Sequence, residues 1–166
     1  MRGRRGTIIR GSVLGAGGLL VLAAVAVAGV SSGKYAGTTT QPGQSSVGKV
    51  KFTVSGNKKA VHVFSGAVFA TCKKGGTTLP ADITLDPTPD MAIKKSAFGF
   101  HGNFNIDSGT VVIAKKVDGS IKGKFGAHSE ATGTMSFKWK FDSNAPSQFR
   151  EFSCTTGTIN FTAKPK

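Results

Sequence analysis

The two cysteines, Cys72 and Cys154, are the residues whose chemistry the sequence constrains most. In an exported protein, which the N-terminus predicts below, the oxidising compartment favours a disulfide between them. A bond that closes a loop of roughly 80 residues stabilises a fold by about 4 kcal/mol in the chain-entropy argument. The alternative is a nucleophilic cysteine activated by a histidine, which requires a reduced thiol. We therefore predict a structural disulfide.

Six lysines occur in three pairs, each with its members two residues apart in a segment that alternates polar and apolar residues. This spacing places both members on the same face of a strand. If consecutive strands that carry two of the pairs form a hairpin, lysine lies nearly opposite lysine, which costs stability. We predict a basic sheet face that binds an anionic polymer or a lipid surface, the alternative being a solvated face that keeps the sheet soluble. The pairs are Lys49 and Lys51, Lys122 and Lys124, and Lys138 and Lys140.

Signals for a metal, a cofactor or catalysis are weak in this sequence. Three aspartates recur every four residues, at 82, 86 and 90, and could gather calcium, but their spacing is not that of an EF-hand loop. The histidines, which lack a zinc-ligand spacing, are His62, His101 and His128. We predict no metal, no cofactor and no enzymatic activity. The alternatives are a secreted hydrolase acting on cell-envelope polymer and a purely structural surface protein.

The N-terminus has the order of regions typical of a secretory signal. Residues 1–12 contain four arginines and no acid, and residues 13–30 are uncharged and apolar. Ala26-Val27-Ala28 then fits the small-x-small pattern of a cleavage site before Gly29. We predict a helical signal peptide over 1–28, and hence a secreted or cell-surface protein. The alternative is an uncleaved membrane anchor with the same outward orientation.

The composition changes twice after the leader. Residues 29–46 are mainly Ser, Thr, Gly, Gln and Pro, which cannot bury enough apolar surface to offset ordering, so we predict a flexible linker. From 47 to 166 apolar and polar residues alternate with period two, as at 50–54, 98–106, 135–141 and 159–163. We predict one all-β domain, an antiparallel β-sandwich of eight or nine strands, with a closed β-barrel as the second choice.

The formal charge of the chain is +14. Four of its 22 Lys and Arg residues lie in the leader, so the folded domain stays basic against eight Asp and Glu. Such a field favours anionic partners. Because export separates the protein from the genome, we expect an anionic cell-envelope polymer or a lipid surface and no nucleic acid.

Short motifs across residues 60–164 resemble an uncharacterised family of secreted actinobacterial β proteins. An early strand ends in a cysteine, and further strands begin near Ser96-Ala97-Phe98, Gly123-Lys124-Phe125 and Gly133-Thr134-Met135. The last strand follows Cys-x-x-Gly, here Cys154-Thr155-Thr156-Gly157, and ends in Thr162-Ala163. The resemblance implies a disulfide-bonded β domain outside the cell and carries no activity with it.

Overall fold

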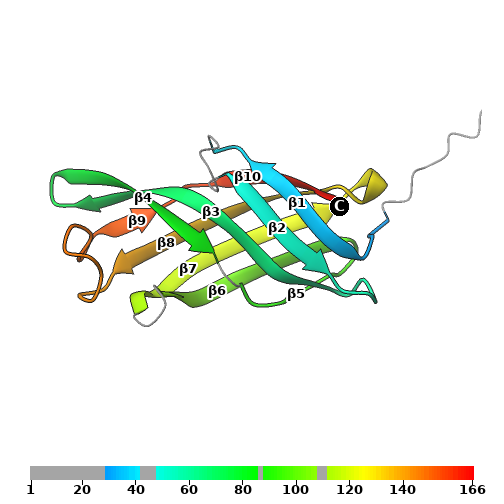
Figure 1. Ribbon diagram of the computed structural model, residues 1–166, viewed down its shortest axis with the longest axis horizontal. Coiled ribbons are helices and arrows are strands. Elements are labelled where there is room, and N and C mark those ends of the chain that lie inside the picture. Colours follow the sequence, from blue (N-terminus) through cyan, green and yellow to red (C-terminus); the bar gives the residue numbers. More distant parts are fainter. Residues whose placement is uncertain (1–28, 42–47, 86–87, 108–111) are drawn as a thin grey trace, which may run out of the picture.

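The computed structural model describes residues 29–41, 48–85, 88–107 and 112–166 (Figure 1). Within these ranges the chain forms ten strands, one 3-10 turn and no α-helix, and no helix there is long and apolar enough to cross a membrane. The predicted signal peptide, 1–28, lies outside the described residues. The elements are β1 Gly33–Thr39, β2 Lys49–Val54, β3 Ala60–Lys74, β4 Thr77–Leu85, β5 Met91–Ala92, β6 Ala97–Asp107, β7 Val112–Phe125, η1 Ala127–Ser129, β8 Ala131–Phe141, β9 Ser153–Thr155 and β10 Ile159–Pro165.

The strands form one continuous antiparallel sheet that closes on itself. The hydrogen-bonded path runs β10–β1–β2–β3–β9–β8, and a further pairing of β10 with β8 closes it. β7 and β6 extend the sheet from β8, whereas β4 and β5 pair with β3. The all-β antiparallel class is therefore confirmed. Of the two predicted architectures the closed barrel is the observed one, because long-range pairing joins strands that a sandwich would place in two sheets.

The predicted linker over 29–46 is wrong for residues 33–39, which form β1. This strand is hydrogen-bonded on both edges, to β2 and to β10. Tyr35, 1% exposed, stacks on Phe52 with ring centroids 4.8 Å apart. Pairing on both edges satisfies the backbone, so one buried aromatic is enough to hold a segment that is otherwise polar. Residues 42–47 of the predicted linker lie outside the described residues.

Aromatic rings from six strands fill the barrel at the end where β1 begins. The pairs are in ring contact at centroid distances of 4.8 to 6.4 Å. Two glycines make room for them: a Cβ at Gly123 would lie 2.2 Å from Cζ of Phe98, and one at Gly133 would lie 2.6 Å from Cζ of Phe161. The rings of Phe98 and Phe161 therefore occupy the space that a side chain at Gly123 or Gly133 would need. The six rings belong to Tyr35, Phe52, Phe64, Phe98, Phe125 and Phe161.

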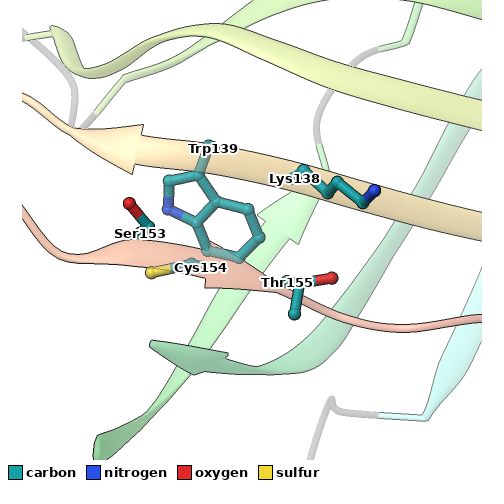
Figure 2. Close-up of a pocket in the computed structure, with 5 residues that line it drawn as sticks. All are labelled: Lys138, Trp139, Ser153, Cys154 and Thr155. Carbon is teal, nitrogen blue, oxygen red and sulfur yellow. The ribbon is translucent and has the colours of Figure 1, made fainter. Parts of the chain in front are cut away.

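At the other end of the barrel, β8 and β9 bring Trp139 opposite Cys154 (Figure 2). Trp139 is 5% exposed and meets Phe141 edge to face, at 5.9 Å between centroids. Trp139 thus belongs to the buried set of the period-two alternation that the sequence shows over 135–141.

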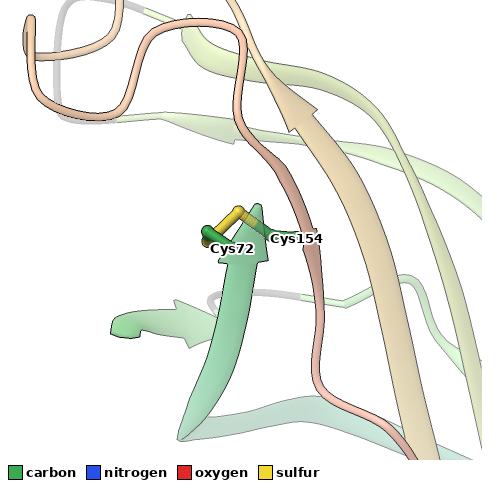
Figure 3. The surroundings of a disulfide bond; sticks show 2 residues. All are labelled: Cys72 and Cys154. Atoms are coloured by element: carbon green, nitrogen blue, oxygen red, sulfur yellow. A yellow bond between two sulfur atoms is a disulfide. The ribbon is translucent and has the colours of Figure 1, made fainter. Parts of the chain in front are cut away.

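The predicted disulfide between Cys72 and Cys154 is confirmed (Figure 3). The two residues lie directly opposite each other on β3 and β9, with Cα atoms 4.0 Å apart, and both are buried. β9 has only three residues, so the disulfide helps to hold this short strand against β3. It lies beyond the part of β3 that pairs with β2.

Candidate functional site

The six lysines predicted to bind a polyanion are all exposed, on the outer face of β2, β7 and β8. The predicted opposition of Lys122 and Lys124 to the lysines of β8 is wrong, since Lys122 lies opposite Thr134 and Lys124 opposite Thr132. The reason is turn length: Phe125 pairs with Ala131, and this register places Lys138 and Lys140 farther along β7. A lysine does lie opposite a lysine there, but the pair is Lys140 with Lys115. The six lysines are Lys49, Lys51, Lys122, Lys124, Lys138 and Lys140.

The lysines of β2 do not share one patch with those of β7 and β8. A row of paired residues crosses the sheet from Lys49 to Lys124 and passes through Thr38, Thr162 and Thr132. Four inter-strand steps separate the row's ends by roughly 19 Å along a curved surface. The predicted single basic face is therefore two separate lysine sites.

The first site is a depression of about 210 Å³ on the outside of β1, β2 and β3, here called the β1–β3 groove. Lys34 and Lys51 lie on neighbouring strands. Lys166 lies beside Lys34, because its backbone N–H donates a hydrogen bond of 2.9 Å to the carbonyl of Lys34. Among the described residues none of these three ammonium groups forms an ion pair, and no carboxylate side chain lines the groove. The lining residues are Lys34, Tyr35, Lys51, Phe52, Thr53, Val63, Ser65 and Lys166.

A bulge in β3 shapes this groove. The β2–β3 register shifts between Lys51 and Thr53, and Val63 has a positive φ of 49°. An extra residue in one strand re-aims side chains, and here it leaves Val63 56% exposed while Phe64 is fully buried. The bulge thus places the apolar side chain of Val63 in the groove, beside the lysine ammonium groups and the hydroxyls of Thr53 and Ser65.

The floor of the groove stays uncharged at physiological pH. Burial raises the pKa of Tyr35, a shift that hydrogen bonds partly oppose. The hydroxyl of Tyr35 donates to the carbonyl of Ser31 at 3.0 Å. A neutral tyrosine adds no negative charge beneath the lysines, so the groove remains cationic.

The second site is a depression of about 300 Å³ on the outside of β6, β7 and β8, here called the β6–β8 depression. His101 lies opposite Ser120, and Asp118 lies opposite Lys138. In the described part of the chain no hydrogen bond joins the histidine, serine and aspartate, although an activated serine requires contact with its base. A catalytic role here rests on proximity alone. The lining residues are His101, Asp118, Ser120, Lys122, Ser136 and Lys138.

Residues 29–33 read Gly-Val-Ser-Ser-Gly, which has the letters of a hydrolase nucleophile elbow. The hydroxyl of Ser129 donates to the carbonyl of Gly29, so the hydroxyl of Ser31 donates to Ser129, at 2.7 Å. Its proton therefore goes to another serine and not to a base. The segment also leads into a strand, whereas the elbow joins a strand to a helix. These bonds instead tie the start of the described chain to the η1 turn.

The described residues contain no group of three His, Cys, Asp or Glu side chains placed to hold a metal ion. His62 instead pairs with Asp90, at 2.7 Å between Nδ1 and Oδ2. Asp86, the middle member of the calcium hypothesis, lies outside the described residues.

Sequence reasoning missed Lys34, Val63 and Lys166 as groove residues. Lys34 was assigned to a linker, although its neighbour Tyr35, the sole tyrosine of the chain, could have indicated a buried anchor. Lys166 enters the groove through the pairing of β10 with β1, which joins residues from the two ends of the domain.

No protein-family model matches this chain, and no match was found among curated proteins or solved structures. The resemblance to secreted actinobacterial proteins therefore stays a prediction.

Proposed function

We propose that this domain is an exported, non-catalytic binding module that holds an anionic cell-envelope polymer in the β1–β3 groove. The observation that carries the proposal is the charge of the groove: Lys34, Lys51 and Lys166 line it together, without a carboxylate side chain among the described lining residues. Like charges gathered on one surface cost stability, and a polyanion would offset that cost.

The chemistry of the groove fits a chain that carries phosphate, sulfate or carboxylate groups on a polyol or sugar backbone. The ammonium groups provide charge-assisted hydrogen bonds to the anions. The hydroxyls of Thr53 and Ser65 are available for uncharged oxygens, and Val63 provides an apolar contact. Lys164, which flanks Ala36 from the side opposite Lys51, extends the basic surface but also lies 3.8 Å from Glu130.

The proposed location follows from the leader and agrees with the disulfide. A basic, apolar, small-residue order predicts export, and disulfides persist in oxidising compartments. Anionic polymers outside the cytoplasm are then the accessible partners.

The test is binding to heparin at graded salt with two matched triple variants. One replaces the groove lysines (Lys34→Gln, Lys51→Gln, Lys166→Gln), and the other replaces three lysines of β7 and β8 (Lys122→Gln, Lys124→Gln, Lys138→Gln). Both lose the same charge. At about 1 kcal/mol per lysine we expect the groove variant to bind about 100-fold more weakly, with a shallower salt dependence. Equal weakening by both variants would show that only net charge matters and would refute the groove.

A hydrolase is the second candidate, favoured only by the shared position of His101, Ser120 and Asp118 in the β6–β8 depression. Incubation with purified cell envelope distinguishes the two functions. Release of soluble fragments that Ser120→Ala abolishes would support the hydrolase, and an unchanged polymer would leave the binding module.

A further inference from the structure

The indole nitrogen of Trp139 is buried and has no hydrogen-bond partner. Within the described ranges, every other buried side-chain nitrogen or oxygen has one. An unsatisfied buried donor costs about 1–3 kcal/mol. Native folds rarely keep such a group without a role or a bound molecule to satisfy it. The nitrogen therefore marks a place where a hydrogen-bond acceptor would be stabilising.

The indole that carries this donor lines a depression of about 470 Å³ at the disulfide end of the barrel (Figure 2). Its surface is mainly apolar, and Trp139 and Cys154 contribute side chains that are otherwise part of the core. The disulfide to Cys72 fixes Cys154, and Phe141 packs against the indole edge to face, so the wall is held in place. The described lining residues are Lys138, Trp139, Ser153, Cys154 and Thr155.

We propose that this depression binds the acyl chain of a lipid, with a carboxylate or ester oxygen of the lipid accepting the Trp139 N–H. An apolar surface with one placed donor suits a hydrocarbon that ends in an acceptor. The volume lies within the range of small-molecule sites, about 300–1,000 Å³. Of the two acceptors a carboxylate is favoured, because Lys138 lines the same depression and the domain is basic.

The proposal does not depend on the β1–β3 groove. The groove lies outside the barrel and its proposed ligand is held by lysines, whereas this site rests on a core tryptophan at the opposite end. A result against polymer binding would leave the lipid site standing, and the converse also holds.

The sequence offers a direct probe, since Trp139 is the sole tryptophan of the chain and its fluorescence reports on this site alone. We would titrate the disulfide-bonded domain with bromine-substituted stearic acid, which quenches tryptophan on contact. The expected result is saturable quenching at one ligand per protein, reversed by unsubstituted stearic acid. Quenching that does not saturate, or that stearic acid does not reverse, would overturn the proposal.

A calorimetric titration with stearic acid tests the role of the N–H itself. Trp139→Phe keeps an aromatic ring and removes the donor, and we expect about tenfold weaker binding. Lys59→Gln, at an exposed position just before β3 begins, is the control and should bind like wild type. Methyl stearate distinguishes the acceptors: weaker binding than stearic acid indicates a carboxylate, and equal binding indicates an ester oxygen. Unchanged affinity in a folded Trp139→Phe would refute the hydrogen bond.

Discussion

The two ends of the barrel solve the same packing problem in different ways. At the end where β1 begins, rings such as those of Tyr35 and Phe52 stack across the interior, and glycines on β7 and β8 make room for others. At the end where β3 meets β9, a disulfide between Cys72 and Cys154 ties the strands together (Figure 3).

This difference separates two kinds of surface. The aromatic end has a filled interior, so the groove proposed to bind a polymer lies outside, where lysines surround the buried Tyr35 and Phe52. The disulfide end gains stability from a covalent bond and keeps an unpaired indole N–H beside an apolar depression. Removing each end's own support should therefore have distinct consequences.

The largest expected effect is the loss of the disulfide in the double variant Cys72→Ala with Cys154→Ala. The bond joins residues 82 apart, which corresponds to about 4 kcal/mol in the chain-entropy argument. Urea unfolding measures the change. Ser153→Ala, at an exposed position next to Cys154, is the control and should change stability by less than about 0.5 kcal/mol. A double variant as stable as this control would contradict the role assigned to the bond.

At the aromatic end, substitutions should lower stability most at a glycine whose neighbouring ring occupies the space that a side chain would need. In Gly123→Ala the new methyl would collide with the ring of Phe98, and overpacking of this kind costs about 1–3 kcal/mol. Gly126→Ala is the matched control, because its Cβ would meet nothing closer than 3.8 Å and its φ is −103°. Thermal unfolding of both variants decides the point, and equal stability would show that the ring can move aside.

A smaller effect is expected from Tyr35→Phe, which removes the hydrogen bond to the carbonyl of Ser31. One such bond is worth about 1 kcal/mol. Thr162→Ala is the control, because Thr162 is exposed and its hydroxyl forms no hydrogen bond within the described structure. Chemical unfolding that shows no difference between Tyr35→Phe and Thr162→Ala would contradict the anchoring role.

The same tyrosine links stability to alkaline pH. Because burial raises the pKa of Tyr35 in the folded state, its contribution is fully present below the unfolded pKa of about 10 and is lost as the pH rises through the folded pKa. As Tyr35 is the only tyrosine, an ultraviolet absorbance titration follows it directly. Ionisation at the ordinary pKa would argue against its burial.

The smallest effect is expected at the exposed pair of Lys74 and Glu151, 3.0 Å apart beside the disulfide end. The hydrogen bond and charge of Lys74 lower the pKa of Glu151. The contribution is therefore present above the ordinary carboxyl pKa and is lost as the pH falls through the folded value. Glu151→Gln should leave the melting temperature unchanged at neutral pH, since exposed pairs contribute little. A clear drop in that temperature would mean that the pair supports the disulfide end.

Local patterns predicted the strands well and their order poorly. Alternation located the strands around Phe52, Phe98 and Phe161, because it reports which face each residue presents to the core. It missed β1, whose only large apolar side chain is Tyr35. Closure depends on β10 pairing with both β1 and β8, contacts between distant parts of the chain that no local pattern encodes.

The candidate site was predicted by residue type and not by position. Both cysteines were correctly paired, since a two-cysteine domain offers one pairing. Of the six lysines, only Lys51 lines the groove, because the strand order separates β2 from β7 and β8. Lys34 and Lys166 come together through strands from the two ends of the domain.

The most direct test of the central claim is nuclear magnetic resonance of the isotope-labelled domain titrated with heparin. The account predicts saturable shifts of backbone amides around Lys34, Lys51 and Ser65, with little change around Ser120 and Lys122. Shifts centred on the β6–β8 depression, or spread evenly over every exposed lysine, would contradict the β1–β3 groove as the binding site.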